Sequence, residues 1–220
     1  MTSLAANTAA NDRAIVHVID DDESPREALG LLFPSVGLDV RTYPTVQQFL
    51  DAGLHDGPGC IVLDVRLPGM TGLEFQSRRD RFGVHLPIVL MTGHGDVPMS
   101  VRAMKAGAVD FLPKPFREQD MIDAVTAAIE RDRERRTAEN KVADLRDRYA
   151  GLSPREKHVM KLVTDGKMNK QVAFELGLSE ITVKTYRGAV MQKMGARTFA
   201  DLVRMAGTLR LGNPSQGCRA

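Results

Sequence analysis

The sequence lacks tryptophan, and aromatic residues make up only 5% of its 220 positions. It also has only two cysteines, Cys60 and Cys218. Two isolated cysteines form neither a disulfide framework nor a zinc-binding pattern, so we expect a reducing compartment such as the cytoplasm. No apolar run is long enough to span a bilayer, and the N-terminus has no basic start followed by an apolar core. These absences predict a cytoplasmic protein with no membrane contact.

The net charge of +2 conceals an uneven distribution along the chain. Residues 151–220 contain 12 Lys and Arg against 5 Asp and Glu, and residues 1–150 contain the remaining 18 against 23. An acidic front part and a basic back part indicate two domains with different tasks. The basic part is suited to bind the phosphate backbone of a nucleic acid.

The front part alternates short apolar runs with helical patterns. Five runs are expected to be strands, and the helices between them imply an α/β fold with a parallel, doubly wound (flavodoxin-like) sheet. Within it, Ser24 is expected to cap a helix, with Glu27 completing a capping box. The expected strands are Ile15–Ile19, Asp39–Tyr43, Cys60–Asp64, Pro87–Thr92 and Ala108–Leu112. The strand 39–43 is the most polar and is expected at an edge.

Several of these strands end in reactive or charged residues. Asp20 and Asp21 follow the first strand, Asp64 and Thr92 end the third and fourth, and Lys114 follows the fifth. Because parallel strands place their carboxyl ends at one edge, these side chains are expected to share a pocket. Three carboxylates together repel one another, and Mg²⁺ is the hard cation that such oxygen ligands suit. Asp64, ionised at neutral pH, could then accept a phosphoryl group without a general base.

The region after the fifth strand is predicted to be helical. Met121, Val125 and Ile129 share one helix face, and the pattern continues through a charged stretch to Leu145. A helical pattern of this length favours a connector that can pair with a second copy. We therefore expect a helical linker over residues 131–148.

The basic part is expected to be a small all-α domain. Asn169–Leu176 and Glu180–Met194 have helix-turn-helix spacing around Gly177, and Ser179 is the expected cap. Ser153 is expected to cap an earlier helix. The residues expected to form the core of the helix pair are Ala173, Leu176, Leu178, Ile181, Val183 and Val190. The outer face of the second helix is basic and has few bulky side chains, which suits the major groove of DNA.

The positions of Asp20, Asp21, Asp64, Thr92 and Lys114 resemble those of the receiver domain of two-component response regulators. The resemblance implies that Asp64 accepts a phosphoryl group from a sensor histidine kinase. It further implies that Asp21 and Asp64 bind Mg²⁺ directly and that Asp20 acts mainly through a water.

Four further expectations come from the same resemblance. The backbone carbonyl of Arg66 would complete the Mg²⁺ ligands, and Thr92 and Phe111 would form a conformational switch. The Lys114–Pro115 peptide bond would be cis. Arg66 and His94 occupy positions that tune the loss of the phosphoryl group.

Residues from about 147 to 206 resemble the LuxR-type DNA-binding domain, and the whole chain resembles the FixJ-like branch of response regulators. The residues that carry the second resemblance are 152–156, 169–173, 178–187 and 193–197. By resemblance, Lys184, Thr185 and Gly188 lie where contacts to base edges and nearby phosphates occur. Lys170, Arg187 and Lys193 are expected to contact phosphates, which fixes orientation without specifying sequence.

The predicted organisation has five parts: a disordered tail over residues 1–13, a receiver domain over 14–130, the linker over 131–148, a LuxR-type domain over 149–207, and a tail over 208–220. The predicted function is a regulator that is phosphorylated on Asp64, dimerises and binds double-stranded promoter DNA, with RNA polymerase as a further candidate partner. The alternative is a DNA-binding regulator whose receiver serves only as a dimerisation platform. An aspartyl-phosphate phosphatase is disfavoured, because such enzymes carry a second Asp two residues after the nucleophile and this chain has Arg66 there. We therefore do not expect an enzyme.

Overall fold

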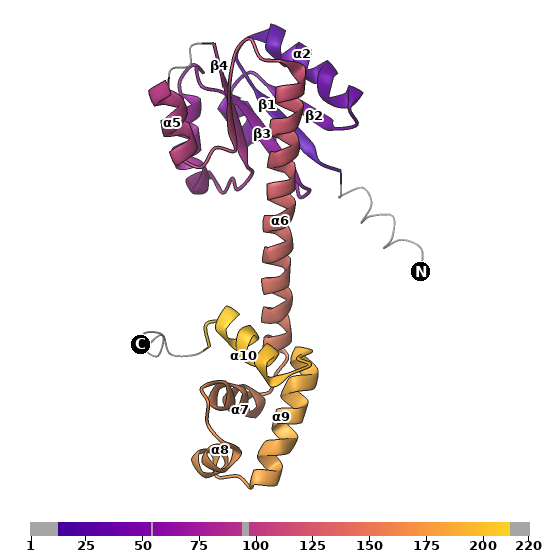
Figure 1. Cartoon of the computed structure of the whole chain (residues 1–220), viewed down its shortest axis with the longest axis vertical. Coiled ribbons are helices and arrows are strands. Elements are labelled where there is room, and N and C mark those ends of the chain that lie inside the picture. Colours follow the sequence, from indigo (N-terminus) through magenta and orange to yellow (C-terminus); the bar gives the residue numbers. More distant parts are fainter. Residues whose placement is uncertain (1–12, 54, 94–96, 212–220) are drawn as a thin grey trace. The chain divides into compact units, whose positions relative to one another are not determined.

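The computed structural model describes residues 13–53, 55–93 and 97–211 and divides the chain into two compact units, residues 1–136 and 137–220 (Figure 1). Residues 1–12 of the predicted N-terminal tail, most of the C-terminal tail, Cys218 and His94 lie outside the described residues. None of the helices in the described part of the chain is both long and apolar enough to cross a membrane.

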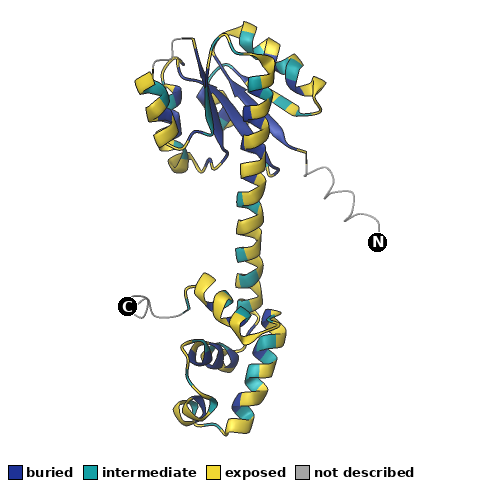
Figure 2. Cartoon of the chain, viewed as in Figure 1, coloured by how far each residue is buried: buried dark blue, intermediate teal, exposed yellow. Residues whose placement is uncertain are grey.

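The first unit is a five-stranded parallel sheet with the strand order β2-β1-β3-β4-β5. The most polar strand, β2, lies at an edge, as predicted. The strands are β1 (Ile15–Ile19), β2 (Asp39–Tyr43), β3 (Gly59–Asp64), β4 (Ile88–Thr92) and β5 (Asp110–Pro113). The helices are α2 (Glu23–Ser35), α3 (Val46–Asp51), α4 (Gly72–Arg78), the short 3₁₀ helix η1 (Arg79–Phe82), α5 (Val97–Lys105) and α6 (Glu118–Ala150). Every residue of β1, β3 and β4 is buried (Figure 2).

Helices cover both faces of this sheet, which confirms the doubly wound prediction. On one face, Phe33 of α2 and Val125 of α6 belong to the same apolar cluster as Val62 of β3. On the other face, Phe49 of α3 and Phe75 of α4 pack with residues of β3 and β4, together with α5. The central strand β3 therefore lies between two apolar layers, and its polar residue, Asp64, lies at the carboxyl end of the strand, at the edge of the sheet.

The start of α2 differs from the prediction. Asp22, not Ser24, is the N-cap, and its carboxylate accepts a hydrogen bond from the backbone nitrogen of Ser24 at 3.1 Å. The predicted capping box with Glu27 was wrong for this reason: the first turn already includes Glu23, so Ser24 lies inside the helix. A carboxylate is as good a cap as a hydroxyl, so the helix begins two residues earlier than predicted, within the acidic run after β1.

The second unit is all-α. It contains the last part of α6, then α7 (Pro154–Thr164), α8 (Asn169–Leu176), α9 (Glu180–Met194) and α10 (Phe199–Thr208). Ser153 caps α7 in a capping box with Glu156, and Ser179 caps α9, both as predicted. Helix α8 ends at Gly177, whose φ of 65° lies in the left-handed region that glycine tolerates best.

The core of the second unit uses part of the connector. Leu145 and Tyr149 of α6 are partly buried and pack against the cluster formed by α7 to α10. The apolar positions late in α6 thus contribute to this unit, which gives them a role that does not need a second copy. That the connector also pairs with a second copy stays a prediction.

Candidate functional site

The acidic pocket lies at the carboxyl edge of the sheet. Asp64 is the last residue of β3, and Asp20 and Asp21 follow β1, the strand that pairs with β3 in parallel register. Each of these three carboxylates offers an oxygen atom, and the three oxygens lie within 4.8 Å of one another. The structure therefore brings together the three carboxylates that the sequence analysis grouped.

Lys114 joins this cluster from the end of β5. Its Nζ atom donates hydrogen bonds to Oδ2 of Asp20 at 2.5 Å and to Oδ2 of Asp64 at 3.4 Å. The Lys114 backbone nitrogen donates to the Thr92 carbonyl at 2.7 Å, which joins this residue to the end of β4. The Lys114–Pro115 bond is cis, as expected. One ammonium thus bridges the carboxylate that follows β1 and the carboxylate that ends β3.

The groups of the pocket differ in how deeply they are buried. Asp20 is fully buried and Asp64 is 7% exposed, whereas Asp21 is exposed. Burial raises the pKa of Asp64, and the nearby charge of Lys114 opposes this rise. Burial lowers the pKa of Lys114, but the hydrogen bond and charge of Asp20, with the charge of Asp64, outweigh it and raise this pKa overall.

Backbone groups hold the two buried carboxylates in place. The backbone nitrogen of Arg66 donates to Oδ1 of Asp64 at 3.3 Å, and that of Asp22 donates to Oδ1 of Asp20 at 3.0 Å. Arg26 was not predicted to take part, but its guanidinium donates to the backbone carbonyl of Asp20 at 2.7 Å. A basic side chain in the first two turns of a helix that follows an acidic strand end is the signal that could have found it.

The two expected switch residues lie on neighbouring strands. Thr92 ends β4 and is fully buried, one position beyond Met91, the register partner of Asp64. Phe111 belongs to β5 and lies opposite Leu90 of β4. It is partly buried against the apolar cluster on the α5 side of the sheet. Thr92 thus lies at the carboxyl end of β4, the strand that pairs with β3, and Phe111 packs against a cluster that includes Ala103 of α5.

The helix pair α8 and α9 forms the second candidate site. Lys170, Lys184, Thr185 and Gly188 are all exposed. Ala173, Val183 and Val190 are buried, as predicted, but Ile181 is 77% exposed. The prediction that Ile181 belongs to the core was wrong, because it lies on the opposite side of α9 from Val183.

The other two predicted DNA contacts already have partners within the protein. Arg187 donates to Oδ1 of Asn169 at 2.6 Å, and its guanidinium carbon lies 5.1 Å from the centre of the Phe199 ring. Lys193 forms an ion pair with Glu156 at 2.8 Å, and the hydrogen bond from Lys193 lowers the pKa of that glutamate. Arginine and lysine have several donors each, so both residues keep donors that a phosphate could use.

Comparisons with known proteins agree with this division of the chain. Residues 16–126 match the response regulator receiver domain, and residues 150–206 match the luxR family of bacterial regulatory proteins. The chain belongs to the two-component response regulators. Nodulation protein W of Bradyrhizobium diazoefficiens is 57% identical to this response regulator over 203 residues, which are 92% of this chain and 89% of the relative.

Two further relatives support the assignment. The transcriptional regulatory protein FixJ of Azorhizobium caulinodans is 47% identical over 191 residues, covering 87% of this chain and 90% of the relative. The solved structure of the response regulator StyR is 44% identical and matches with a TM-score of 0.78, covering 89% of this chain and 98% of that one. This response regulator is accordingly a transcription factor with a LuxR-type DNA-binding domain, and it is not an enzyme.

Proposed function

We propose that this response regulator is switched on by transfer of a phosphoryl group from a sensor histidine kinase to Asp64. The observation that carries the proposal is the contact of Lys114 with both Asp20 and Asp64 in one acidic pocket. Removing two carboxylates and a lysine from water carries a desolvation penalty, and well-packed apolar residues would stabilise the fold at least as well. A purely structural role therefore does not explain these residues.

The chemistry asks little of the protein beyond positioning and charge. One Asp64 oxygen attacks the phosphorus of the kinase phosphohistidine, the phosphorus–nitrogen bond breaks, and the imidazole leaves with that electron pair. The ammonium of Lys114 is close enough to neutralise an oxygen of the transferred group, and the Thr92 hydroxyl is the proposed partner of another. The Arg66 backbone nitrogen holds Oδ1 of Asp64 in place.

The donor set fits Mg²⁺. All three carboxylates present hard oxygen ligands within 4.8 Å of one another, and one of them, Asp21, is exposed and open to water, which suits an ion that keeps several waters. We propose that Asp21, Asp64 and the Arg66 carbonyl hold the ion directly, with Asp20 acting through a water. When bound, the ion would neutralise negative charge on the carboxylates and on the transferred phosphoryl oxygens.

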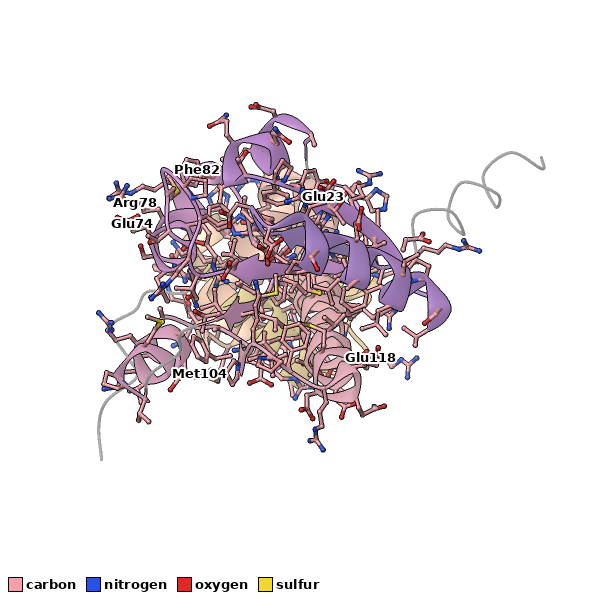
Figure 3. All side chains as sticks on the ribbon, turned by 90° about the horizontal axis from the view of Figure 1, so that it is seen from above. Glu23, Glu74, Arg78, Phe82, Met104 and Glu118 are labelled. Carbon is pink, nitrogen blue, oxygen red and sulfur yellow. The ribbon has the colours of Figure 1, made fainter. Side chains whose placement is uncertain are left out.

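The proposed response to phosphorylation is a change in the α5–β5 surface, which leads to dimerisation. The Thr92 hydroxyl moves toward the phosphoryl group, and the Phe111 ring fills the space that it leaves. Helix α5 carries exposed apolar residues at Val97, Val101 and Met104, with the spacing of one helix face. Met104 is labelled at the margin of the first unit in Figure 3. We propose that a second copy covers this stripe.

The dimer would present two copies of α9 to promoter DNA, in half-sites whose centres lie about 34–36 Å apart. Lys184, Thr185 and Gly188 are the proposed contacts near base edges, and Lys170, Arg187 and Lys193 the proposed phosphate contacts. Substitution of Lys170, Arg187 or Lys193 should weaken binding to all DNA sequences, because phosphate contacts do not depend on sequence. RNA polymerase is a proposed partner at the promoter.

Phosphorylation by a small phosphodonor tests the proposal directly. Intact-protein mass spectrometry after incubation with acetyl phosphate and Mg²⁺ should show one phosphoryl group on the wild type and none on Asp64→Asn. The matched control is Asp80→Asn, which changes an exposed carboxylate in η1. A phosphorylated Asp64→Asn protein would remove Asp64 from the role.

The alternative is a receiver that serves only as a dimerisation platform. The exposed stripe on α5 is compatible with it, since a constitutive dimer would use the same surface. This alternative predicts a dimer without any phosphodonor and no uptake of beryllofluoride, the phosphoryl mimic, in the presence of Mg²⁺.

A further inference from the structure

The first turn of α9 carries a large apolar side chain that the protein core does not use. Ile181 is 77% exposed, whereas Val183, two positions later, is fully buried. Val190 and Met194 continue the buried face of the helix. Packing of the second unit therefore gives no reason for isoleucine at position 181.

Helix formation gives no reason either. Isoleucine is a weaker helix former than alanine, lysine or glutamate, any of which would suit an exposed position in a first turn. The N-cap of α9 is supplied by Ser179, whose side chain accepts from the backbone nitrogen of Thr182. The start of the helix is thus secured by other residues.

Ile181 shares its helix face with residues already proposed to meet DNA. Positions 181, 185, 188 and 192 differ by four, three and four, so they lie on one side of α9. All four are exposed. The hydroxyl of Thr185 donates to the backbone carbonyl of Ile181 at 3.1 Å, and a Cβ at Gly188 would meet nothing within 4 Å. Ile181 is the largest apolar group on this face.

We propose that Ile181 reads the C5-methyl group of a thymine in each half-site. The inference rests on the proposed function, in which the outer face of α9 enters the major groove. Residues near the N-terminus of a recognition helix are the ones that reach base edges. Thymine alone presents a methyl group in that groove, and an aliphatic side chain, which has no hydrogen bond to offer, matches it. Their contact removes apolar surface from water on both partners.

The neighbouring Lys184 and Thr185 complement this contact. Lys184 can donate to guanine or to a phosphate, so its selectivity differs from that of Ile181. Thr185 also has a methyl group, which makes it the rival for the same readout. The experiment must separate these two side chains.

The test replaces thymine by uracil, which removes only the methyl group. Full-length protein with beryllofluoride and Mg²⁺ first selects duplexes from a random library. Each thymine of the selected half-sites is then replaced in both halves, and affinity is measured by fluorescence anisotropy. At one position, the replacement of thymine by uracil should lower the affinity about fourfold per half-site, the loss expected for one buried methyl-sized group. In Ile181→Ala that position should become insensitive to uracil, while other positions keep their response.

Thr185→Ser is the matched control, because it removes a methyl group and keeps the hydroxyl. If Thr185→Ser abolishes the uracil response, if Ile181→Ala retains it, or if the selected half-sites contain no thymine, the inference is wrong. The variant Lys184→Ala distinguishes failure of the inference about Ile181 from failure of the proposed function. If Lys184→Ala binds the selected duplex as tightly as wild type, the outer face of α9 does not read DNA. If it binds weakly while Ile181→Ala changes nothing, only the inference fails.

Discussion

The carboxylate of Asp132 accepts a hydrogen bond from the backbone nitrogen of Gly59 at 3.2 Å, although 73 positions separate the two residues. Asp132 lies in α6 and is fully buried, and Gly59 is the first residue of β3. Arg135 and Arg136 pair with the same carboxylate at 2.6 and 2.8 Å. The helix that leads to the second unit is thus tied to the opposite end of the strand that carries Asp64.

Removing this carboxylate should destabilise the first unit. In Asp132→Ala the buried Gly59 N–H loses its acceptor, which should cost about 1–3 kcal/mol, and Asp132→Asn, which keeps an acceptor oxygen, should lose less. The midpoint of urea unfolding and the exchange rate of the Gly59 amide measure the effect. Asp120→Ala, which breaks an exposed pair with Arg117, is the control and should leave both unchanged. Equal effects of the two alanine variants would contradict the assigned role of Asp132.

Gly72 is predicted to position the phosphoacceptor. A Cβ at Gly72 would lie 2.3 Å from the backbone carbonyl oxygen of Asp64, and the Gly72 nitrogen donates to the Val65 carbonyl at 2.9 Å. Gly72→Ala must therefore shift the backbone that carries Asp64. We expect a loss of about 1–3 kcal/mol in stability, as for overpacking in a core, and a slower reaction with acetyl phosphate.

Gly30→Ala is the control for this variant. The added Cβ would lie 3.9 Å from the Thr42 Cγ2 atom, an ordinary contact, and alanine is the better helix former in α2. Its stability should be unchanged or raised, and its phosphorylation rate should equal that of the wild type. A Gly72→Ala protein that reacts at the wild-type rate would show that the turn after β3 does not control Asp64.

His17 should make stability depend on pH. It is 1% exposed, its Nδ1 lies 3.2 Å from the Tyr43 hydroxyl, and its ring meets Phe49 edge to face. Burial, with the nearby charges of Arg41 and His55, lowers its pKa from 6.5 to about 4. Between these two values the unfolded chain binds more protons, so the free energy of unfolding should fall as the pH drops through this window and stay level above it.

The size of this effect is bounded by the shift, at about 3 kcal/mol over the full window. Urea unfolding at several pH values measures it. His17→Gln should flatten the slope between pH 6.5 and 4, whereas His85→Gln, at an exposed position, should not. An unchanged slope in His17→Gln would assign the acid sensitivity to other groups.

The apolar stripe on α5 is predicted to be the dimer surface. Val97→Lys combined with Met104→Lys places charges on the stripe without touching the acidic pocket, so the variant should still take up beryllofluoride but stay monomeric. Leu31→Lys, which alters a 77% exposed apolar residue on α2, should dimerise normally. Analytical ultracentrifugation distinguishes the two. Dimerisation of the α5 variant would place the interface elsewhere.

Much of this architecture could be predicted because its signals are local. Apolar runs that end in Asp64 or Thr92 mark buried parallel strands, and parallel strands place their carboxyl ends at one edge of the sheet, so the residues of the pocket could be grouped from the sequence. The exposure of Ile181 could not be predicted in the same way, because an aliphatic residue near Val183 in the sequence is compatible with either the buried or the exposed face of α9. The link from Asp132 to Gly59 joins a side chain to a backbone atom 73 positions away, which no residue pattern marks.

The most direct test of the account is the mass of the full-length protein in solution with and without beryllofluoride in the presence of Mg²⁺. Light scattering should report a monomer without the mimic and a dimer with it for the wild type, and a monomer in both conditions for Asp64→Asn. A wild type whose mass does not change, or an Asp64→Asn protein that dimerises with the mimic, would contradict the claim that the pocket at Asp64 controls assembly.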